Sequence, residues 1–463
     1  MTDLFRPVLD AAHSRALDYL TTVADRPVAR PIDHEALLTR IGGELPEHGI
    51  DPVSVVNDLA AAVDPGLVAS NGGRYFGFVT GGTLPAAIGA DWMASAWDQN
   101  TALWAMSPAA ITVQRAAESW VLELLDLPRT AGVGTVTGAQ MANWTCLAAA
   151  RHHVMAEVGW DVEMLGLNGA PMLHVVVGEY RHSTIDRALR FLGVGVGTMT
   201  VVPSDDQGRM DAHALRTVLG QVDGPLIVCA QAGEVNTGAF DPFDPIVDAV
   251  HAQGGWVHVD GAFGLWARAC RDLRPLTEGL ERADSWSVDG HKWLNVPYDT
   301  GFAITAHPEA HAAAMTQLAP YLVPEADARR DPMNWSPEAS RRGRGLPVYA
   351  AIRSLGRRGV DDLIARTCRL ARRFGDQLRG VAGVEILNDI VLNQVLVRFT
   401  TADDPDAHTR SIIERVHADG TCWVGGTTFR GRAAMRISVS GWSTTEDDVD
   451  CSVAAILRCA GLD

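Results

Sequence analysis

The chain has 463 residues, is 47% hydrophobic and 21% charged, and carries a formal net charge of −17. This is ordinary globular composition, and at this length we expect a large core divided into two or three lobes. The acidic balance, with no basic run anywhere, argues against nucleic acid and anionic membrane surfaces as partners.

The first 20 residues predict an amphipathic helix that contains acidic side chains. They lack the basic and then apolar layout of a signal peptide, and no apolar run in the chain is long enough to span a bilayer. The seven cysteines include no C-x-x-C pair. We therefore expect reduced, mostly buried thiols in a cytoplasmic protein.

Three domains are expected along the chain: a helical segment over residues 1–75, a large domain over 76–345 and a small α+β domain over 346–463. In the large domain, apolar runs rich in β-branched residues predict strands at 174–179, 198–204, 225–231, 256–260, 285–289 and 301–306. Helical patterns separate them at 183–193, 211–222 and 242–254. Near-continuous apolar strands alternating with helices indicate an α/β fold, with a mostly parallel sheet covered on both faces.

The small domain has a long helical pattern over 349–378 and strand patterns at 394–400 and 434–440. Between the two domains, residues 322–342 lack periodicity and are rich in proline and charge. We predict a mobile, functional loop there.

Ligands of open α/β sheets bind beyond the carboxyl ends of the strands, so the residues at those ends are the candidates for a site. Gly138, Ala139 and Gln140 precede a strongly helical segment, where free N–H groups and the helix dipole suit a phosphate. A tight turn before a core helix is the alternative. His182 follows a strand and could stack on a flat ligand or act as a general base, although a lone histidine is commonly just a hydrogen-bonded polar residue.

Asp260 ends a predicted buried strand, and Gly261 and Ala262 leave space beyond it. A buried carboxylate needs a cationic or N–H partner, so Asp260 could hold a protonated ring nitrogen, or it could cap the following turn.

Lys292 is the only lysine in the chain. A GC-rich genome explains the many arginines but not this exception, because an amine can form a Schiff base and a guanidinium cannot. Trp286 and Trp293 flank the lysine, so we expect partial desolvation, which lowers the pKa of an amine; a surface lysine is the alternative.

These four elements offer a phosphate cradle, a carboxylate for a pyridinium, an imidazole for a ring face and an amine for an aldehyde. Pyridoxal 5′-phosphate (PLP) needs all of them. Around these residues, 290-GHKWLNVPYD-299 and 258-HVDGAFG-264 resemble motifs of the group II PLP-dependent amino-acid decarboxylases, which include aromatic-amino-acid and glutamate decarboxylases. The stretches 107–125 and 337–356 match as well, and the resemblance runs from about Arg74 to about Val453.

The resemblance implies the fold-type-I, aminotransferase-like architecture and a homodimer with active sites at the subunit interface, to which residues 1–75 contribute contacts. It also implies decarboxylation of an L-amino acid to the amine and carbon dioxide. The roles that it implies are a Schiff base on Lys292, a ring-nitrogen contact from Asp260, stacking by His182, phosphate binding by Ala139 and Gln140, and positions near the phosphate for Asp289 and His291.

The sequence departs from the family in two places. The tyrosine that the family's mobile loop supplies to reprotonate Cα is missing from 330-RDPMNW-335, where Pro332 or Met333 falls near its position. We do not expect Tyr321, which lies earlier, to replace it, so His182 and Lys292 become candidate proton donors. The stretch 231–242 also departs from the Gly-Thr-Thr of animal members, which concerns contacts near the ring oxygen.

The substrate side chain is expected to be aromatic or apolar, because Phe76, Phe78 and Trp104 align with the part of the family that lines the side-chain pocket. Core or interface packing is the alternative. Aldol cleavage, transamination and oxidative aldehyde formation are rival reactions of the same cofactor. A different class, a metallohydrolase, would use His258, Asp260, Asp289 and His291 as ligands.

Overall fold

The computed structural model describes residues 2–29, 31–317 and 331–462. The chain divides into two compact units, which we describe separately: Met1–Thr80 with Arg373–Leu387 and Leu396–Asp463, and Gly81–Arg372 with Asn388–Val395. The three domains expected from the sequence are contiguous stretches, whereas these units combine segments that are far apart in the chain. The three-domain division stays a prediction. Among the described residues, no helix combines the length and the apolar character that crossing a bilayer requires.

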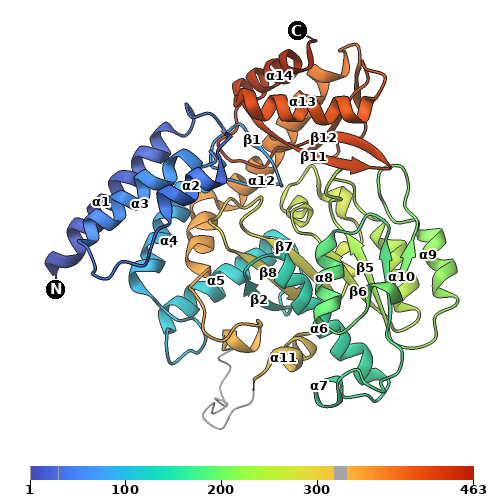
Figure 1. Ribbon diagram of the computed structural model, residues 1–463. Coiled ribbons are helices and arrows are strands. Elements are labelled where there is room, and N and C mark those ends of the chain that lie inside the picture. The colour runs from blue at the N-terminus through green and yellow to red at the C-terminus, as the bar shows by residue number, and fades with distance from the viewer. Residues whose placement is uncertain (1, 30, 318–330, 463) are drawn as a thin grey trace. The chain divides into compact units, whose positions relative to one another are not determined.

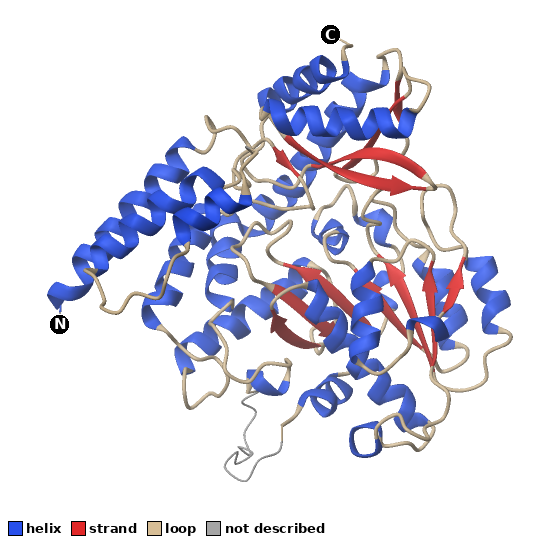
Figure 2. Cartoon of the chain, viewed as in Figure 1, coloured by secondary structure: helices blue, strands red, loops and turns tan. Residues whose placement is uncertain are grey.

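A seven-stranded sheet organises the second unit, and its strands are drawn as red arrows in Figure 2. In spatial order the strands are β2 (Gly132–Val136), β8 (Gly301–Thr305), β7 (Ser285–Asp289), β6 (Trp256–Asp260), β5 (Leu226–Gln231), β3 (His174–Gly178) and β4 (Thr200–Val202). Neighbours from β7 to β4 pair in parallel, whereas β8 is antiparallel to both β7 and β2. The predicted α/β fold with a mostly parallel sheet is therefore confirmed.

Helices cover both faces of this sheet, which is why its central strands are apolar along their whole length (Figure 1). The helices of this unit are α4 (Pro85–Trp97), α5 (Pro108–Leu124), α6 (Ala139–Glu157), α7 (Val162–Leu165), α8 (Ser183–Phe191), α9 (Ala212–Leu219), α10 (Phe243–His251) and α11 (Pro308–Met315). Short 3₁₀ turns lie at Val196–Thr198, Gly264–Ala269, Arg274–Thr277, Leu280–Arg282 and Pro332–Asn334.

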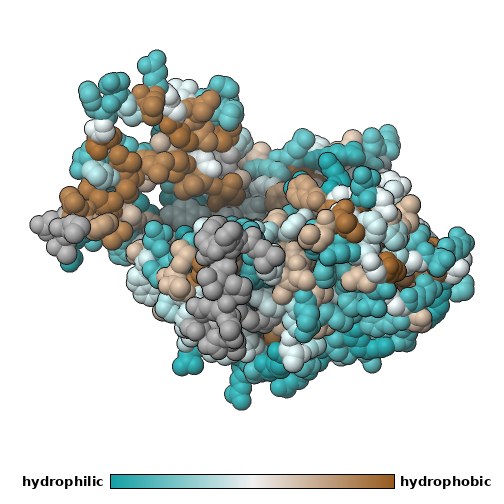
Figure 3. All heavy atoms as spheres, turned by 90° about the horizontal axis from the view of Figure 1, so that it is seen from below, coloured by the Kyte–Doolittle hydropathy of each residue, from teal (hydrophilic) through white to brown (hydrophobic). Residues whose placement is uncertain are grey.

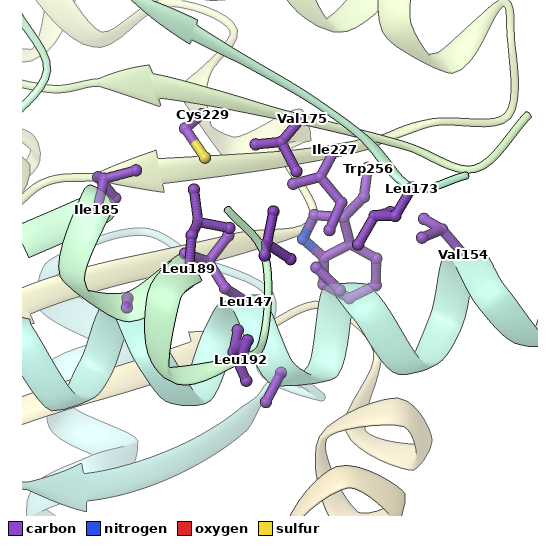
Figure 4. Close-up of a cluster of buried hydrophobic side chains, with 14 of the residues drawn as sticks. Leu147, Val154, Leu173, Val175, Ile185, Leu189, Leu192, Ile227, Cys229 and Trp256 are labelled. Atoms are coloured by element: carbon purple, nitrogen blue, oxygen red, sulfur yellow. The ribbon is translucent and has the colours of Figure 1, made fainter. Parts of the chain in front are cut away.

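One core cluster fixes α6 and α8 on the sheet. Figure 4 shows Leu147 of α6 and Leu189 of α8 directed at Ile227, Cys229 and other side chains of the strands. The indole of Trp256, from β6, lies in the same cluster. Burial of such large side chains, at roughly 25 cal/mol per Å² of apolar surface, anchors the helix whose first turn reaches the candidate site.

The first unit contains a five-stranded sheet with the order β1-β11-β12-β10-β9. Its strands are β1 (Tyr75–Phe76), β9 (Val384–Ile386), β10 (Gln394–Phe399), β11 (Trp423–Phe429) and β12 (Arg432–Ser438). Its helices are α1 (Thr2–Thr22), α2 (His34–Ile41), α3 (Pro52–Val63), α13 (Pro405–Asp419) and α14 (Glu446–Ala460), with a 3₁₀ turn at Asp64–Gly66. The long helix α12 (Gly345–Arg379) belongs to the second unit up to Arg372, and it bends at Gly356, which adopts a φ of 62°.

The structure adds strands that the sequence analysis did not predict, β1, β2, β9 and β11. They are short or rich in glycine, so their β-propensity is weak. The predicted mobile loop lies partly outside the described residues, which resume at Asp331. In the described part, Met333 is buried and its N–H donates to the carbonyl of Ala102 at 3.2 Å.

Candidate active site

The candidate site lies at the edge of the large sheet where its parallel strands end. Asp260 is the last residue of β6 and Asp289 the last residue of β7. These strands are neighbours, and Asp260 is in register with Ser287. The first turn of α6 follows β2 at the same edge, because Val136 at the end of β2 pairs with Gly301 at the start of the reversed strand β8. The topology thus brings the predicted segments together.

Lys292 follows β7 by one turn and points at the carboxylate that ends that strand. Its Nζ lies 3.1 Å from Oδ2 of Asp289, and its side chain is 22% exposed. The other carboxylate oxygen, Oδ1, accepts the N–H of Ala139 at 2.5 Å. Ala139 is the first residue of α6, so a single carboxylate links the lysine to the helix N-terminus.

The two tryptophans that flank Lys292 in sequence are core residues. The indole N–H of Trp286 donates to the carbonyl of Leu280 at 2.9 Å, and that of Trp293 donates to Oγ1 of Thr367 at 2.9 Å. They fix the backbone on both sides of the lysine, whose own side chain remains only partly exposed, as the sequence predicted.

Glycines give this edge its close packing. A Cβ on Gly138 would lie 2.9 Å from Cε1 of His291, and a Cβ on Gly301 would lie 2.5 Å from the Cα of Gly138. A side chain at Gly138 would displace the ring of His291, and one at Gly301 would require the backbone to move. The glycine before α6 therefore serves close approach of the backbone to neighbouring groups, as phosphate-binding turns require.

His291 lies beside the same carboxylate. Its Nδ1 accepts the N–H of Thr300 at 3.2 Å, and its Nε2 lies 3.5 Å from Oδ1 of Asp289. Burial lowers the pKa of His291, and the charge of Lys292 adds to this effect, while Asp289 opposes it. The neutral ring carries its proton on Nε2, because Nδ1 is the acceptor.

Asp260 is buried and accepts only neutral hydrogen-bond donors from the described residues. These are Nδ2 of Asn143 at 3.1 Å, the N–H of Ala262 at 3.2 Å and Oγ of Ser287 at 3.4 Å. A buried carboxylate with long, neutral hydrogen bonds is suited to a cationic partner, such as a protonated ring nitrogen.

His182 caps the N-terminus of α8 and is exposed. Its Nδ1 lies 2.9 Å from Oγ1 of Thr184, which in turn accepts Nδ2–H of Asn143 at 3.2 Å. The side-chain amide nitrogen of Gln140 donates to the carbonyl of Thr184 at 3.3 Å, and its Oε1 is buried and finds no hydrogen-bond donor among the residues that the structure describes. The predicted imidazole, helix start and carboxylate thus belong to one hydrogen-bonded group.

The residues predicted for the substrate pocket are packed in different ways. Phe76 is buried in β1 and packs edge-on against Phe374, as a core side chain does. Phe78 is 62% exposed and contacts the ring of Trp423. Trp104 is half-buried, and its backbone N–H donates to Oδ1 of Asp331 at 2.7 Å. Phe76 fits the packing alternative, and the exposed ring of Phe78 is available to a ligand or a partner.

Sequence reasoning missed Asn143, Thr184 and Ser287, which bind the predicted residues. Asn143 could have been found, because it lies three positions after Gln140 and therefore on the same side of a helix. Ser287 lies two positions before Asp289 on a strand and faces the same side of the sheet. Thr184 has no comparable signal, since its role depends on the turn that joins β3 to α8.

The donor set fits PLP. Lys292 offers an amine, Asp260 a carboxylate for the ring nitrogen, His182 an imidazole for a ring face, and the start of α6 a cradle for the phosphate. One detail differs from the expectation. The N–H of Ala139 is already bonded to Asp289, so a phosphate there would compete with this carboxylate.

Residues 35–400 match the family model described as the pyridoxal-dependent decarboxylase conserved domain, and the chain belongs to this family. It is 27% identical to tryptophan decarboxylase 1 of Oryza sativa subsp. japonica, over 94% of this chain and 90% of that protein. It is 28% identical to L-2,4-diaminobutyrate decarboxylase of Rhizobium meliloti (strain 1021), over 80% of this chain and 74% of that protein.

Among solved structures, the crystal structure of Oryza sativa TDC with PLP and tryptamine is similar, with a TM-score of 0.92 and 25% sequence identity, covering 100% of this chain and 99% of that one. The protein is therefore a PLP-dependent amino-acid decarboxylase, as the sequence predicted.

The metallohydrolase alternative is wrong. Family membership excludes it, and so does the geometry of His258. This side chain is fully buried, with Nε2 2.9 Å from Oδ1 of Asn143 and Nδ1 2.9 Å from Oγ of Ser285. Both ring nitrogens are thus occupied by hydrogen bonds, and neither can bind a metal ion.

Proposed function

We propose that this decarboxylase acts on an L-amino acid with an aromatic side chain and that Lys292 carries its PLP. The observation that carries the site assignment is the position of the only lysine, 3.1 Å from Asp289 at the carboxyl edge of the sheet. Aromatic specificity is supported by the relatives, one named tryptophan decarboxylase and one crystallised with tryptamine.

Each group at the edge receives a role in this proposal. When bound, the cofactor supplies an electron-accepting ring that takes the electron pair released as the carboxylate leaves as carbon dioxide. Asp260 keeps a proton on the ring nitrogen, and Ala262 holds that carboxylate through its N–H. His182 covers a face of the ring.

The start of α6 binds the phosphate in the same proposal. Gly138 leaves room for it, and Asp289 and His291 lie beside it. Gln140 would donate to it, and so would Ala139 once its N–H leaves the carboxylate of Asp289. Asp289 also orients the amine of Lys292 before the cofactor binds.

The segment before Gly81 supports Phe78 as a pocket residue. Phe78 and Val79 have φ values of 52° and 59°, a left-handed conformation that is rare for a β-branched residue and that often marks functional sites. Two positions on, the backbone at Gly81 touches the carbonyl of Lys292, which a Cβ would approach to 1.8 Å. The strained turn therefore directly precedes the segment that contacts the carbonyl of Lys292. We also propose Trp104 as a substrate contact, because it aligns with the part of the family that lines the side-chain pocket.

The proton that replaces the carboxylate on Cα comes from His182 or Lys292 in this proposal. Met333 is buried and has no acidic group, and Tyr321 lies outside the described residues. With Tyr321→Phe we expect the amine to remain the product. An aldehyde or a large loss of turnover would assign the proton step to Tyr321 instead.

We also propose that the protein is a homodimer with shared active sites. Helix α1 leaves Leu4 74% and Phe5 66% exposed, and Leu9 and Leu17 are exposed as well. Figure 3 shows hydrophobic side chains gathered at the left, where the N-terminal helices lie. A surface of this kind is typical of an interface, and a second copy of the chain is the occupant that the family resemblance implies.

A cytoplasmic location is proposed from the thiols. All seven cysteines are free, and five of them are buried. This fits a compartment that keeps thiols reduced.

The deciding experiment incubates the purified holoenzyme with each common amino acid and identifies the products by mass. We expect an amine and carbon dioxide from an aromatic substrate. We also expect borohydride reduction to abolish the absorption band of the bound cofactor and to leave the reduced cofactor covalently attached to Lys292. An amine formed only from diaminobutyrate or another polar amino acid would overturn the aromatic assignment. A ketoacid, glycine or an aldehyde with ammonia would show one of the rival reactions.

A further inference from the structure

A line of buried polar side chains runs from Asp260 into the core. Nδ2 of Asn143 donates to Oδ2 of Asp260 at 3.1 Å, and Oδ1 of Asn143 lies 2.9 Å from Nε2 of His258. Nδ1 of His258 lies 2.9 Å from Oγ of Ser285, which accepts the indole N–H of Trp256 at 2.8 Å. All four side chains behind Asp260 are almost completely inaccessible to solvent.

The two ends of this line fix the direction of every hydrogen bond in it. A carboxylate only accepts and an indole N–H only donates. The amide oxygen of Asn143 must therefore face His258, which carries its proton on Nε2. Nδ1 then accepts the hydroxyl proton of Ser285. One arrangement of hydrogens satisfies all the groups, and aligned hydrogen bonds of this kind polarise one another.

Burial also keeps His258 neutral, since it lowers the pKa of this imidazole to about 4. Cationic His258 would carry a proton on both nitrogens, and the line could not keep its single direction. The neutral ring is therefore the form that the hydrogen bonds require.

Secondary structure holds the line in place. Residues 256, 258 and 260 alternate along β6 and face the same side of the sheet, and His258 is in register with Ser285 of β7. Trp256 sits among the apolar side chains of the cluster in Figure 4, so the far end of the line is anchored. Asn143 comes from α6, the helix whose start forms the phosphate cradle.

We propose that His258 is a positioning residue for the decarboxylase: through Asn143 it orients the carboxylate of Asp260 so that this group keeps a proton on the ring nitrogen of the cofactor. This inference rests on the proposed contact between Asp260 and the ring nitrogen. The second hydrogen of the Asn143 amide is used by Thr184, which is bonded to His182. The line thus positions Asp260, which would hold the ring nitrogen, together with His182, which would cover a ring face.

The test compares His258→Leu, which removes both hydrogen bonds at similar volume, with His258→Gln, whose amide nitrogen can replace Nε2–H. Holoenzymes are prepared with PLP labelled with ¹⁵N in the ring, and the ¹⁵N shift of the ring nitrogen, the dissociation constant of the cofactor, kcat and KM are measured. Thr409→Val is the control, because it removes a buried hydroxyl that accepts the N–H of Phe399 in the other unit.

For His258→Leu we expect the ¹⁵N shift to move toward the unprotonated value and kcat to fall about tenfold, with KM within about twofold, the scale seen for groups that orient a functional ligand. His258→Gln should restore most of the wild-type ¹⁵N shift and most of kcat. Thr409→Val should alter only the stability of the protein. Should His258→Leu not fold, Ser285→Ala must move the shift in the same direction. An unchanged ¹⁵N shift in folded variants would overturn the proposal and leave His258 a purely structural residue.

The wild-type protein separates this inference from the proposed function. If its ring nitrogen is unprotonated, or if borohydride fails to attach the cofactor to Lys292, the proposed site itself is wrong, and the inference falls with it. If the wild-type spectra are as expected, the variants test the line alone.

Discussion

At the scale of single residues, chemistry singles out Lys292 and Asp260. The lysine is the only amine-bearing side chain in the sequence, and the structure places its amine 3.1 Å from the carboxylate of Asp289. The aspartate is a buried carboxylate with neutral donors. Neither Lys292 nor Asp260 is a large apolar core residue, so each can be substituted without leaving a large cavity in the core.

Lys292→Arg retains the positive charge beside Asp289 but cannot form a Schiff base. We therefore expect a folded dimer without the visible band of the bound cofactor and without turnover, measured by absorbance and by amine release. Retained turnover would refute the Schiff-base assignment.

Asp260→Ala should lower the rate severely, by two orders of magnitude or more (~3 kcal/mol in activation free energy), while PLP still binds weakly. The matched control is Asp241→Asn, because Asp241 is also buried and its oxygens accept the N–H groups of Met210 and Gln231. Burial raises the pKa of Asp241 to about 6, and its carboxylate binds backbone N–H groups and not the side chains that we assign to the cofactor. Its variant should change stability but not kcat, and unchanged kinetics in Asp260→Ala would rule out the ring-nitrogen role.

At the scale of elements, close contact between backbones sets the shape of the edge. Strand β8 runs against its neighbours and brings Gly301 onto the turn before α6. This contact positions the helix start that we assign to the phosphate.

Gly301→Ala should cost roughly 1–3 kcal/mol of unfolding free energy, because its Cβ would lie 2.5 Å from the Cα of Gly138 and the backbone must shift. Urea unfolding of the apoprotein and a PLP titration measure the two effects. In Gly89→Ala, within α4, a Cβ meets nothing within 4 Å, so the same change there should be neutral or stabilising by up to about 1 kcal/mol. Equal effects in the two variants would contradict the packing argument.

Two histidines that bind Asp284 give a pH dependence: His251 is the last residue of α10 and His307 directly precedes α11. The hydrogen bond to Asp284 raises the pKa of His251. Burial opposes ionisation of Asp284, but hydrogen bonds from His251 and His307 outweigh it and lower the pKa of Asp284. The stabilisation from His251 is then complete below its unfolded pKa of about 6.5 and is lost as the pH rises through the folded value.

At pH 5.5 we expect the unfolding free energy of the wild type to exceed that of His251→Gln. The difference should be less than about 1 kcal/mol, because the histidine side chain is 39% exposed. This difference in unfolding free energy should disappear by pH 8.5. Urea titrations at several pH values measure it. A gap that widens with pH would contradict the direction of the shift.

At the scale of the whole molecule, the exposed apolar side chains of α1 form the surface at which we propose that a second copy of the chain binds. Phe5→Glu with Leu9→Glu should convert the dimer to a monomer in sedimentation velocity and lower turnover, if the active sites are shared. Met164→Glu, at another exposed apolar side chain, is the control and should leave the dimer intact. A wild-type monomer at micromolar concentration would refute the dimer.

The sequence predicted the large sheet well because its strands are continuous apolar runs between helices. It predicted the positions of Lys292, Asp260 and His182 at strand ends for the same reason. Asn143 was missed although its spacing from Gln140 places both on one side of a helix. Thr184 could not be predicted, because its role depends on the turn that joins β3 to α8. The relation of Phe78 to its neighbours also escaped, because a left-handed turn at Phe78 and Val79 contradicts the preference of these residues.

The single lysine has a practical consequence for labelling. Any reagent that modifies primary amines has one side-chain target in this protein, aside from the chain terminus. That target is partly exposed, and we propose it as the attachment point of the cofactor. A bound cofactor should therefore shield it, and the extent of modification would directly count empty sites in a preparation. The same reagent could then follow cofactor loss over time without any spectroscopic probe.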